Sequence, residues 1–329
     1  MRRHLLASAT VAVAALSLAA CGTSEPSTSD ASASASAKTS EKITLTDDAG
    51  KKLTLDGPAT KVIATEWNIV EDLVSLGVDP VGVSDIKGYN AWDTAAPLKG
   101  SPKDIGTRGE PSMDTVAALA PDLVVASSDL SAAVIDQLRK VAPVMVVTSA
   151  AGADQIGTMN EGLDLIAKAT GTEDKAVEVK KTFDESIAEG KKALADAGLA
   201  GAEIATADAY VDANKVSVRA YTGTSLLGAV NEKLGLKNAW TIEGDEAYGL
   251  ATTDVEGLTK LGDVHFPYIA NDADGDPFVD NLSKNAVWKS LPFVKDGNVH
   301  RLPDGVWMFG GPLSMQAYVD SLVDALTKK

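Results

Sequence analysis

The sequence predicts an α/β protein with two parallel-sheet lobes and flanking helices, joined by a single long rigid helix. Apolar, strand-like segments alternate with helix-like segments over residues 43–172 and again over residues 199–329. Alternation of this kind, with near-continuous apolar strands, is typical of parallel sheets that helices cover on both faces. Between the two stretches, residues 173–198 contain no proline and repeat apolar residues with a helical period.

Residues 1–21 have the layout of a lipoprotein signal peptide. Basic residues precede an apolar run over residues 5–20, which is too short for a comfortable membrane span. The run ends in LAACG, which resembles a bacterial lipobox and implies lipidation of Cys21. A non-lipidated signal with a chance cysteine is the alternative. The sequence leaves open whether export uses the general or the twin-arginine route.

Residues 22–42 consist mainly of serine, threonine and alanine. A segment of this composition cannot bury a core, so we expect a flexible tether. Tether and lipid together predict a folded part anchored at the extracytoplasmic face of the cell membrane.

The N-terminal lobe is predicted over residues 43–172. It opens with ITLTDDAGKKLTL at residues 43–55, where a DAG turn separates two alternating segments of a β-hairpin. The expected strands after it are 62–65, 80–84, 123–127 and 144–148, and the expected helices are 69–76, 112–120, 131–141 and 153–169. Parallel sheets bind ligands at the carboxyl ends of their strands, where we expect the site.

The interdomain helix is predicted over residues 173–198. Thr172 can cap its start, and Gly198 stands where helices often end. At a rise of about 1.5 Å per residue it would be roughly 37 Å long. An ordinary surface helix is the alternative, but its position between two stretches of domain size favours a strut. One face is apolar: Ala176, Val179, Phe183, Ile187, Gly190 and Leu194.

The C-terminal lobe is predicted over residues 199–329, with the same architecture as the first. The expected strands are 204–211, 216–221, 264–270 and 298–302, and the expected helices are 224–234, 254–261 and 312–327. Trp240 and Trp288 are flanked by helix-end and core-like residues, and we expect them to pack. Other aromatic residues follow strand ends or lie in loops, where a pocket would form: Trp67, Trp92, Trp307, Tyr89, Tyr248 and Phe309.

Composition and motifs limit the classes of function. The net charge of −16 argues against nucleic acid as a partner. Cys21 is the single cysteine and only His265 and His300 follow the leader, so we expect no disulfide and no directly bound metal. There is no GxGxxG after a strand, no Walker lysine loop and no GxSxG, which weighs against a nucleotide enzyme and a hydrolase. We expect no enzymatic activity.

Several stretches together resemble one family. They are EDLVSLGVDPVGVSD and PSMDTVAALAPDLVVAS in the first half, and TGTSLLGAVNEKLGLKNAW and LPFVKDGNVHRLP with WMFGGPLSM in the second. The chain after the tether resembles bacterial ABC-transporter substrate-binding proteins of the long-helix class, which serve ferric siderophores, haem and cobalamin. The resemblance implies a non-enzymatic monomer that delivers its ligand to a membrane permease and carries no cofactor of its own.

A closer resemblance is to the ferric hydroxamate binding proteins. DIGTRGEPSMD is similar to a stretch of that branch whose arginine, here Arg108, reaches the iron-bound hydroxamate oxygens. The segments YNAW, EAYG and WMFG resemble pocket segments of the same branch. The candidate ligand-binding residues are therefore Arg108, Trp67, Tyr89, Trp92, Tyr248, Trp307 and Phe309. Haem, cobalamin or a catecholate siderophore is the alternative ligand.

Some features leave the ligand open. The branch has a pocket tyrosine where this chain has Ser127-Ser128-Asp129, and a serine where it has Leu250. Arg108 has the alternative role of a salt bridge to Asp104 or Glu110. The proposed chemistry nevertheless suits the residues, because a siderophore supplies all six iron ligands and the protein needs only flat apolar area and a forked donor.

Two acidic residues are candidates for permease docking. Asp114 and Glu256 lie at predicted helix starts, one in each lobe. In the family that the chain resembles, acidic residues at matching positions meet arginines of the permease. The alternative is that both residues simply favour a helix N-terminus.

Overall fold

The computed structural model describes residues 41–152, 154–213 and 215–328. Residues 40–329 form one compact unit. The predicted signal peptide, Cys21 and nearly all of the predicted tether lie outside the described residues. Of the helices in the described ranges, none is long and apolar enough to cross a membrane.

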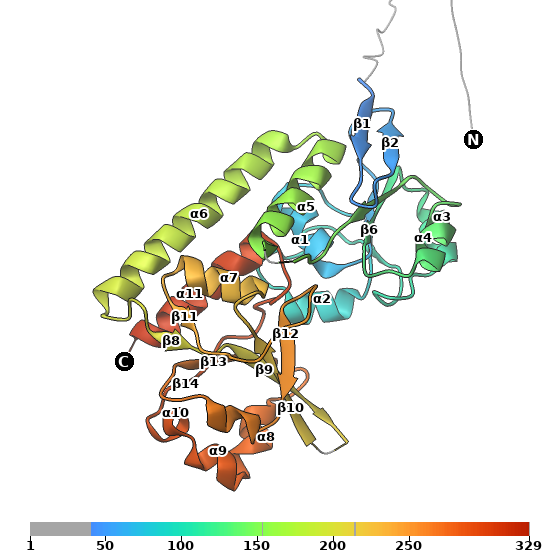
Figure 1. The fold of residues 1–329 in the computed structure, drawn as a ribbon. Coiled ribbons are helices and arrows are strands. Elements are labelled where there is room, and N and C mark those ends of the chain that lie inside the picture. Colours follow the sequence, from blue (N-terminus) through green and yellow to red (C-terminus); the bar gives the residue numbers. More distant parts are fainter. Residues whose placement is uncertain (1–40, 153, 214, 329) are drawn as a thin grey trace, which may run out of the picture. The chain divides into compact units, whose positions relative to one another are not determined.

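The first lobe contains a five-stranded sheet in which all neighbouring strands are parallel, as predicted. Its strands, in sheet order, are β5 (Lys103–Asp104), β4 (Gly82–Val83), β3 (Val62–Ala64), β6 (Leu123–Ser127) and β7 (Val144–Val147). The predicted hairpin is also present, as β1 (Ile43–Thr46) and β2 (Lys52–Leu55) (Figure 1).

Helices cover both faces of this sheet because successive strand residues point to opposite sides. Val125 and Val147 pack with α1 and α5, whereas Val124 and Val146 pack with α3 and α4. The helices of the lobe are α1 (Trp67–Ser75), α2 (Ile86–Trp92), α3 (Met113–Leu119), α4 (Ala132–Leu138) and α5 (Gln155–Thr170).

The sheet of the second lobe is mixed, which corrects the prediction of a second parallel sheet. Antiparallel pairs join β9 to β10 and β10 to β12, and β13 runs parallel to β9 and β14. Only two residues separate β9 from β10, and a connection that short allows only an antiparallel pair. In sheet order the strands are β12 (Leu250–Thr253), β10 (Lys215–Tyr221), β9 (Ala207–Asp212), β13 (Phe266–Ile269) and β14 (Val299–Arg301).

Shorter elements complete the second lobe. The helix predicted over residues 254–261 is only a 3₁₀ turn, η1 (Gly257–Lys260). Trp240 and Trp288 pack around Phe266, as predicted. The remaining elements are β8 (Glu203–Ile204), β11 (Lys237–Asn238), α7 (Leu226–Lys233), α8 (Pro277–Asp280), η2 (Leu282–Lys284), α9 (Ala286–Ser290), α10 (Pro292–Lys295) and α11 (Pro312–Thr327).

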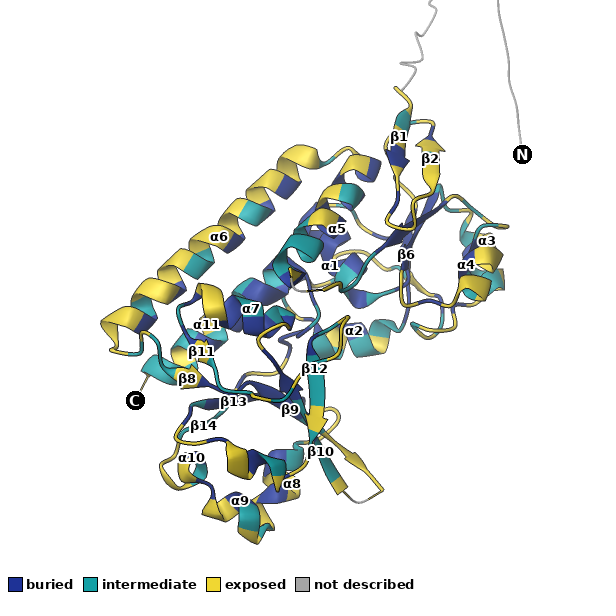
Figure 2. Ribbon diagram, in the orientation of Figure 1, coloured by how far each residue is buried: buried dark blue, intermediate teal, exposed yellow. Residues whose placement is uncertain are grey.

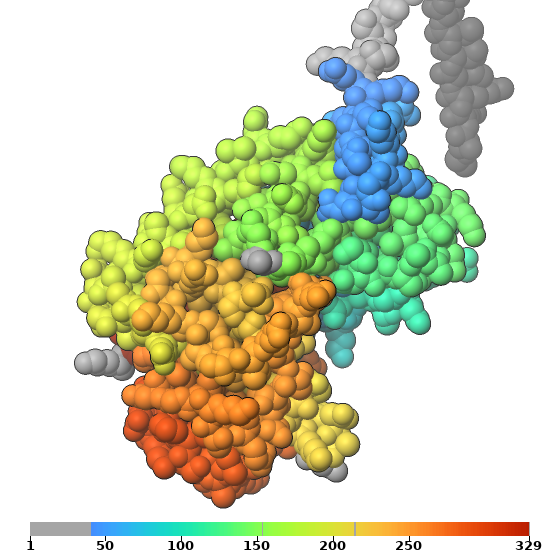
Figure 3. All heavy atoms as spheres, in the orientation of Figure 1, coloured from blue at the N-terminus to red at the C-terminus, as the bar shows by residue number. Residues whose placement is uncertain are grey.

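The predicted long helix is α6 (Glu173–Asp196), and it spans 24 residues. It lies along α5 of the first lobe and α11 of the second (Figure 1). Figure 3 shows its residues, in yellow-green, at the edge of the molecular surface. Its inner residues are buried and its outer face is exposed (Figure 2). Thr172 makes no capping hydrogen bond through its side chain, and its hydroxyl pairs with that of Thr170 instead.

Gly190 is the point at which α6 packs most closely on its neighbours. A Cβ atom there would lie 2.7 Å from Val319 and 2.9 Å from Leu234. The glycine therefore allows close packing of α6 against α11 and α7. One continuous core, which includes α1, α5, α6, α7 and α11, runs through both lobes.

A buried carboxylate joins α1 to the start of α11. Both oxygens of Glu71 accept hydrogen bonds: from the backbone N–H of Gly311 at 2.8 Å, and from the N–H and hydroxyl of Ser314 at 2.8 and 2.7 Å. A helix N-terminus offers unpaired N–H groups and partial positive charge, so it compensates much of the cost of burying the carboxylate. This contact fixes the two helices together.

Asp93 and Asp72 are buried beside Glu71. Burial, the charge of Glu71 and a hydrogen bond to it raise the pKa of Asp93 to about 10. Burial also raises the pKa of Glu71, although its donors act in the opposite direction. Because Glu71 receives three donors, we infer that Asp93 carries a proton at neutral pH and Glu71 carries the charge.

Replacing Asp93 with asparagine is expected to make the protein increasingly more stable than the parent as pH rises. A raised pKa in the folded state means that the contribution of protonated Asp93 is complete below its unfolded pKa, near 4, and is lost as pH rises toward about 10. The asparagine amide keeps a donor and never ionises. Denaturant titrations give the free energy of unfolding of both proteins. The value for Asp93→Asn minus the value for the parent should therefore increase by up to about 1.4 kcal/mol per pH unit between pH 5 and 8.

The control is Glu243→Gln, in an exposed loop of the second lobe. The difference in free energy of unfolding between this variant and the parent protein should be the same across the pH range. A constant difference for Asp93→Asn as well would show that Asp93 is ionised in the folded protein.

Candidate functional site

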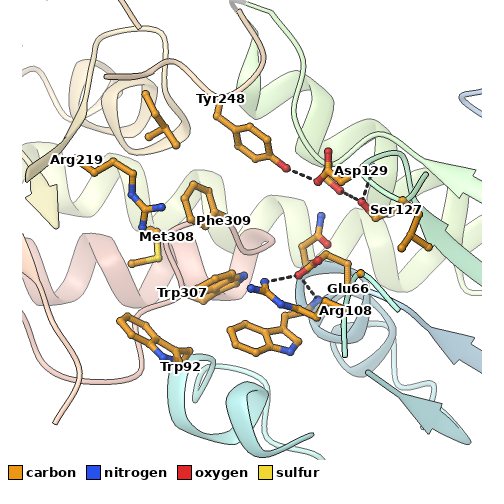
Figure 4. A pocket seen from close by; sticks show the side chains of 16 residues that line it. Glu66, Trp92, Arg108, Ser127, Asp129, Arg219, Tyr248, Trp307, Met308 and Phe309 are labelled. Carbon is orange, nitrogen blue, oxygen red and sulfur yellow. Dashed lines mark hydrogen bonds and ion pairs between the residues drawn. The ribbon is translucent and has the colours of Figure 1, made fainter. Parts of the chain in front are cut away.

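A cavity of about 590 Å³ lies between residues of the two lobes (Figure 4). This volume is in the range of small-molecule sites. Part of its wall lies just beyond the carboxyl ends of β3, β6 and β7, as parallel-sheet architecture predicts. Its lining comprises Glu66, Trp67, Asn68, Trp92, Arg108, Gly109, Ser127, Asp129, Leu130 and Ser149 from the first lobe, and Arg219, Tyr248, Leu250, Trp307, Met308 and Phe309 from the second.

Five aromatic side chains form a continuous aromatic cluster in the wall. Trp307 is at its centre, with ring centroids 4.7 Å from Trp67, 6.1 Å from Trp92 and 5.2 Å from Phe309. Tyr248 extends the cluster, 5.5 Å from Phe309. All four contacts are edge-to-face, which holds the rings in fixed orientations and leaves flat apolar area toward the cavity.

Arg108 is held in place by an ion pair and an aromatic face. Its Nη1 donates to Oε1 of Glu66 at 2.8 Å, and its Cζ lies 4.0 Å from the ring centre of Trp67. The partner is thus neither Asp104 nor Glu110, the two alternatives raised by the sequence. Glu66 is itself fixed, because it caps α1 by accepting the N–H of Trp67. Arg108 therefore presents an oriented guanidinium in the cavity.

Arg219 is a second cavity arginine that sequence reasoning missed. It lies on β10, and its Nε donates to Oδ1 of Asp208 on β9 at 2.9 Å. Its Cζ also lies 5.3 Å from the ring centre of Phe309. Arg219 and Asp208 are direct partners in the register of the antiparallel pair. A β9–β10 hairpin, had it been predicted, would have placed them opposite each other.

Asp129 and Glu66 were also missed. Asp129 follows β6, and its carboxylate accepts the hydroxyl of Tyr248 from the other lobe. Burial raises the pKa of Tyr248, and this hydrogen bond raises it further. The sequence marked residues 127–129 only as a departure from a pocket tyrosine.

Six of the seven predicted ligand-binding residues line the cavity, and Tyr89 does not. The Tyr89 side chain is fully buried, and its hydroxyl donates to the backbone oxygen of Ala96. Burial and the nearby charges of Asp93, Glu71 and Asp72 raise its pKa. The prediction that Tyr89 contacts the ligand is therefore wrong for this arrangement, because core packing covers its ring.

The two predicted docking residues are exposed. Asp114 lies in the first turn of α3, which Ser112 caps, and Glu256 immediately precedes η1. Among the described residues neither has an ion-pair partner. Both are free to meet another molecule, and their role in docking stays a prediction.

No candidate metal centre appears in the described part of the chain. There, no group of three or more His, Cys, Asp or Glu residues could hold a metal ion. His265 and His300 lie together, with 3.4 Å between Nδ1 and Nε2, and they do not line the cavity. The cavity itself offers aromatic area, two oriented guanidinium groups and two carboxylates.

Comparison with known proteins identifies relatives over most of the chain. Residues 62–305 match the model of a family described as periplasmic binding protein. The Fe(3+)-citrate-binding protein YfmC of Bacillus subtilis is 29% identical over 281 residues, covering 82% of this chain and 81% of that protein. The iron(3+)-hydroxamate-binding protein FhuD of Escherichia coli is 26% identical over 269 residues, covering 82% and 88%.

A solved structure matches as well. The siderophore-binding protein FhuD of Vibrio cholerae, determined with Fe3+–Desferal bound, superposes with a TM-score of 0.73 at 25% identity. The match covers 82% of this chain and 98% of that chain. The likeness supports the two-lobed α/β architecture seen here.

A matched pair of tyrosine variants tests where the two hydroxyls lie. Tyr89→Phe removes the donor to the buried Ala96 oxygen and should lower the free energy of unfolding by about 1–3 kcal/mol. Tyr248→Phe removes a donor to exposed Asp129, which water can replace, and should cost under about 0.5 kcal/mol. Denaturant unfolding of both variants is the measurement, and equal costs would contradict the correction for Tyr89.

Proposed function

Because the chain belongs to the periplasmic binding protein family, whose members bind solutes and are not enzymes, we propose that it is the binding lipoprotein of an ABC importer. It captures a ferric siderophore of the hydroxamate type outside the cell and delivers it to the membrane permease. The observation that carries this proposal is the fixed guanidinium of Arg108 inside an aromatic cluster. Cys21 carries the lipid, and the binding protein acts as a monomer.

The cavity chemistry supports a ferric complex as ligand. A hexadentate siderophore fills all six iron positions, so the protein contacts only its organic shell and the outer sides of the oxygens. Trp67, Trp92 and Trp307 supply rigid apolar area at low entropic cost. A guanidinium has five N–H donors, of which Arg108 uses one for Glu66, so donors remain for paired oxygens.

The relatives include proteins named for hydroxamate, citrate and catecholate complexes, so the choice of hydroxamate rests on the chemistry of the cavity. The names of both FhuD proteins state hydroxamate or Desferal binding, whereas YfmC is named for ferric citrate. Haem, cobalamin or a catecholate siderophore remains the second candidate. A panel of ferric hydroxamate, catecholate and citrate complexes with haem and cobalamin, followed by quenching of tryptophan emission, tests the assignment. Saturable quenching by hydroxamate complexes at the lowest concentration is the expected result.

Arg108→Ala is expected to weaken hydroxamate binding roughly 10- to 150-fold. The basis is the loss of a charged hydrogen bond, which contributes about 1.5–3 kcal/mol. Arg108→Lys should restore only part of the affinity, because an ammonium group keeps the charge but cannot donate two parallel hydrogen bonds to paired oxygens. Thermal unfolding of the ligand-free variants should be nearly unchanged, since Glu66 keeps its bond to the Trp67 N–H.

The control is Arg139→Ala, which removes a surface ion pair on α4 outside the cavity. Calorimetric titration gives the affinities. Unchanged affinity of Arg108→Ala for every hydroxamate tested would overturn the hydroxamate assignment and favour haem or cobalamin.

The variant Asp114→Ala/Glu256→Ala is expected to bind ligand normally and to abolish uptake into cells. Both side chains are exposed and outside the cavity, so their contribution lies in attraction to a basic permease surface. Docking to the permease should also weaken as ionic strength rises. Cellular uptake of 55Fe-labelled ligand and binding to purified permease are the measurements.

The matched control is Glu178→Ala/Glu185→Ala, which removes two exposed acids from α6. This variant should retain uptake. Loss of ligand affinity in the Asp114/Glu256 variant would place these residues in binding instead of docking.

A further inference from the structure

The charges of the groups around the cavity do not sum to zero, and the remainder is negative. Arg108 is paired with Glu66, and Arg219 is paired with Asp208. Asp129 is the remaining carboxylate, and in the described ranges no Lys, Arg or His lies within ion-pair distance of it. With Asp208 counted as the partner of Arg219, although it does not itself line the cavity, two cations and three carboxylates leave one excess negative charge. A further acid, Asp274, accepts the Trp92 indole N–H and adds to the negative side.

Asp129 also has open acceptor positions. Its described side-chain contact is the Tyr248 hydroxyl, and a carboxylate can accept about four hydrogen bonds. The residue is exposed, so a cation can reach it without losing all of its water. Figure 4 shows Asp129 and Tyr248 joined at one side of the cavity, separate from the Glu66–Arg108 pair.

Ferric siderophore complexes differ in charge by simple valence. Three singly charged hydroxamates balance Fe3+, whereas three doubly charged catecholates leave three excess negative charges. A strongly anionic complex would need unpaired cations in the site, and both cavity arginines already have carboxylate partners. Like charges brought together in an interface cost several kcal/mol.

We propose that the cavity selects ferric trihydroxamates without net negative charge, and that Asp129 binds the pendant ammonium of those that carry one. This inference rests on the proposed function and adds the charge class of the ligand and a specificity-determining residue. The iron-bound oxygens face Arg108, and the ammonium group at the end of a linear siderophore reaches the carboxylate of Asp129 beside Tyr248.

The test compares two ferric ligands that differ by one charge. Ferric Desferal is a linear trihydroxamate with a terminal amine, and its N-acetylated form is the neutral match. The parent protein should bind the amine form about 3- to 10-fold more tightly, as expected for a partly exposed ion pair. Asp129→Asn should lose this preference. Tyr248→Phe, which keeps the carboxylate, should retain it.

Tryptophan quenching at low and high salt gives the affinities, and the preference of the parent should shrink as salt rises. A ferric triscatecholate should bind at least about 100-fold more weakly than either Desferal complex. Equal affinity of the parent for both Desferal forms, or equal weakening of both by Asp129→Asn, would overturn the role of Asp129. Tight binding of the triscatecholate with no binding of either Desferal complex would instead overturn the proposed function.

Discussion

The buried carboxylate of Glu71 is the contact on which the cavity depends. It lies one turn after Trp67 in α1, and its three donors belong to the segment that follows Phe309 at the start of α11. A buried carboxylate without such donors would cost several kcal/mol, so the helix start and the carboxylate stabilise each other. The same contact joins α1, which begins with Trp67, to the segment that follows Trp307, and the two rings lie 4.7 Å apart.

The two arginines of the cavity are also held in position by protein contacts before a ligand binds. Arg108 lies against the ring of Trp67 and pairs with Glu66, and Arg219 pairs with buried Asp208. Fixed donors lose less conformational entropy when a ligand binds. The pairing also cancels their charge, so orientation of the donors, and not excess positive charge, is what the site offers.

The sequence predicted the first lobe better than the second for a physical reason. Apolar strands separated by helices favour parallel neighbours. The sequence between β9 and β10 lacks the Asn-Gly or Asp-Gly signal of a tight hairpin. Missing that hairpin hid the register that brings Arg219 to Asp208. Tyr89 was misplaced because it was expected in a loop, whereas it lies on α2 and the core covers its ring. Trp67 was placed correctly because it follows the carboxyl end of β3, where a parallel sheet positions its site.

Several contacts hold the two lobes together in the absence of a ligand. Selection among ligands is therefore expected to depend on the residues of the cavity wall. The shared core passes through α6, and Gly190 in that helix packs tightly and is not free to bend. Hydrogen bonds from Asn271 to the Ala91 carbonyl and from Gln155 to the Ala247 carbonyl, each 2.6 Å long, also cross between the lobes. A ligand that needs a wider opening would have to break these contacts. On the proposed function, discrimination among ferric complexes of similar size therefore falls to the charges and rings at the wall, among them the carboxylate of Asp129 beside Tyr248.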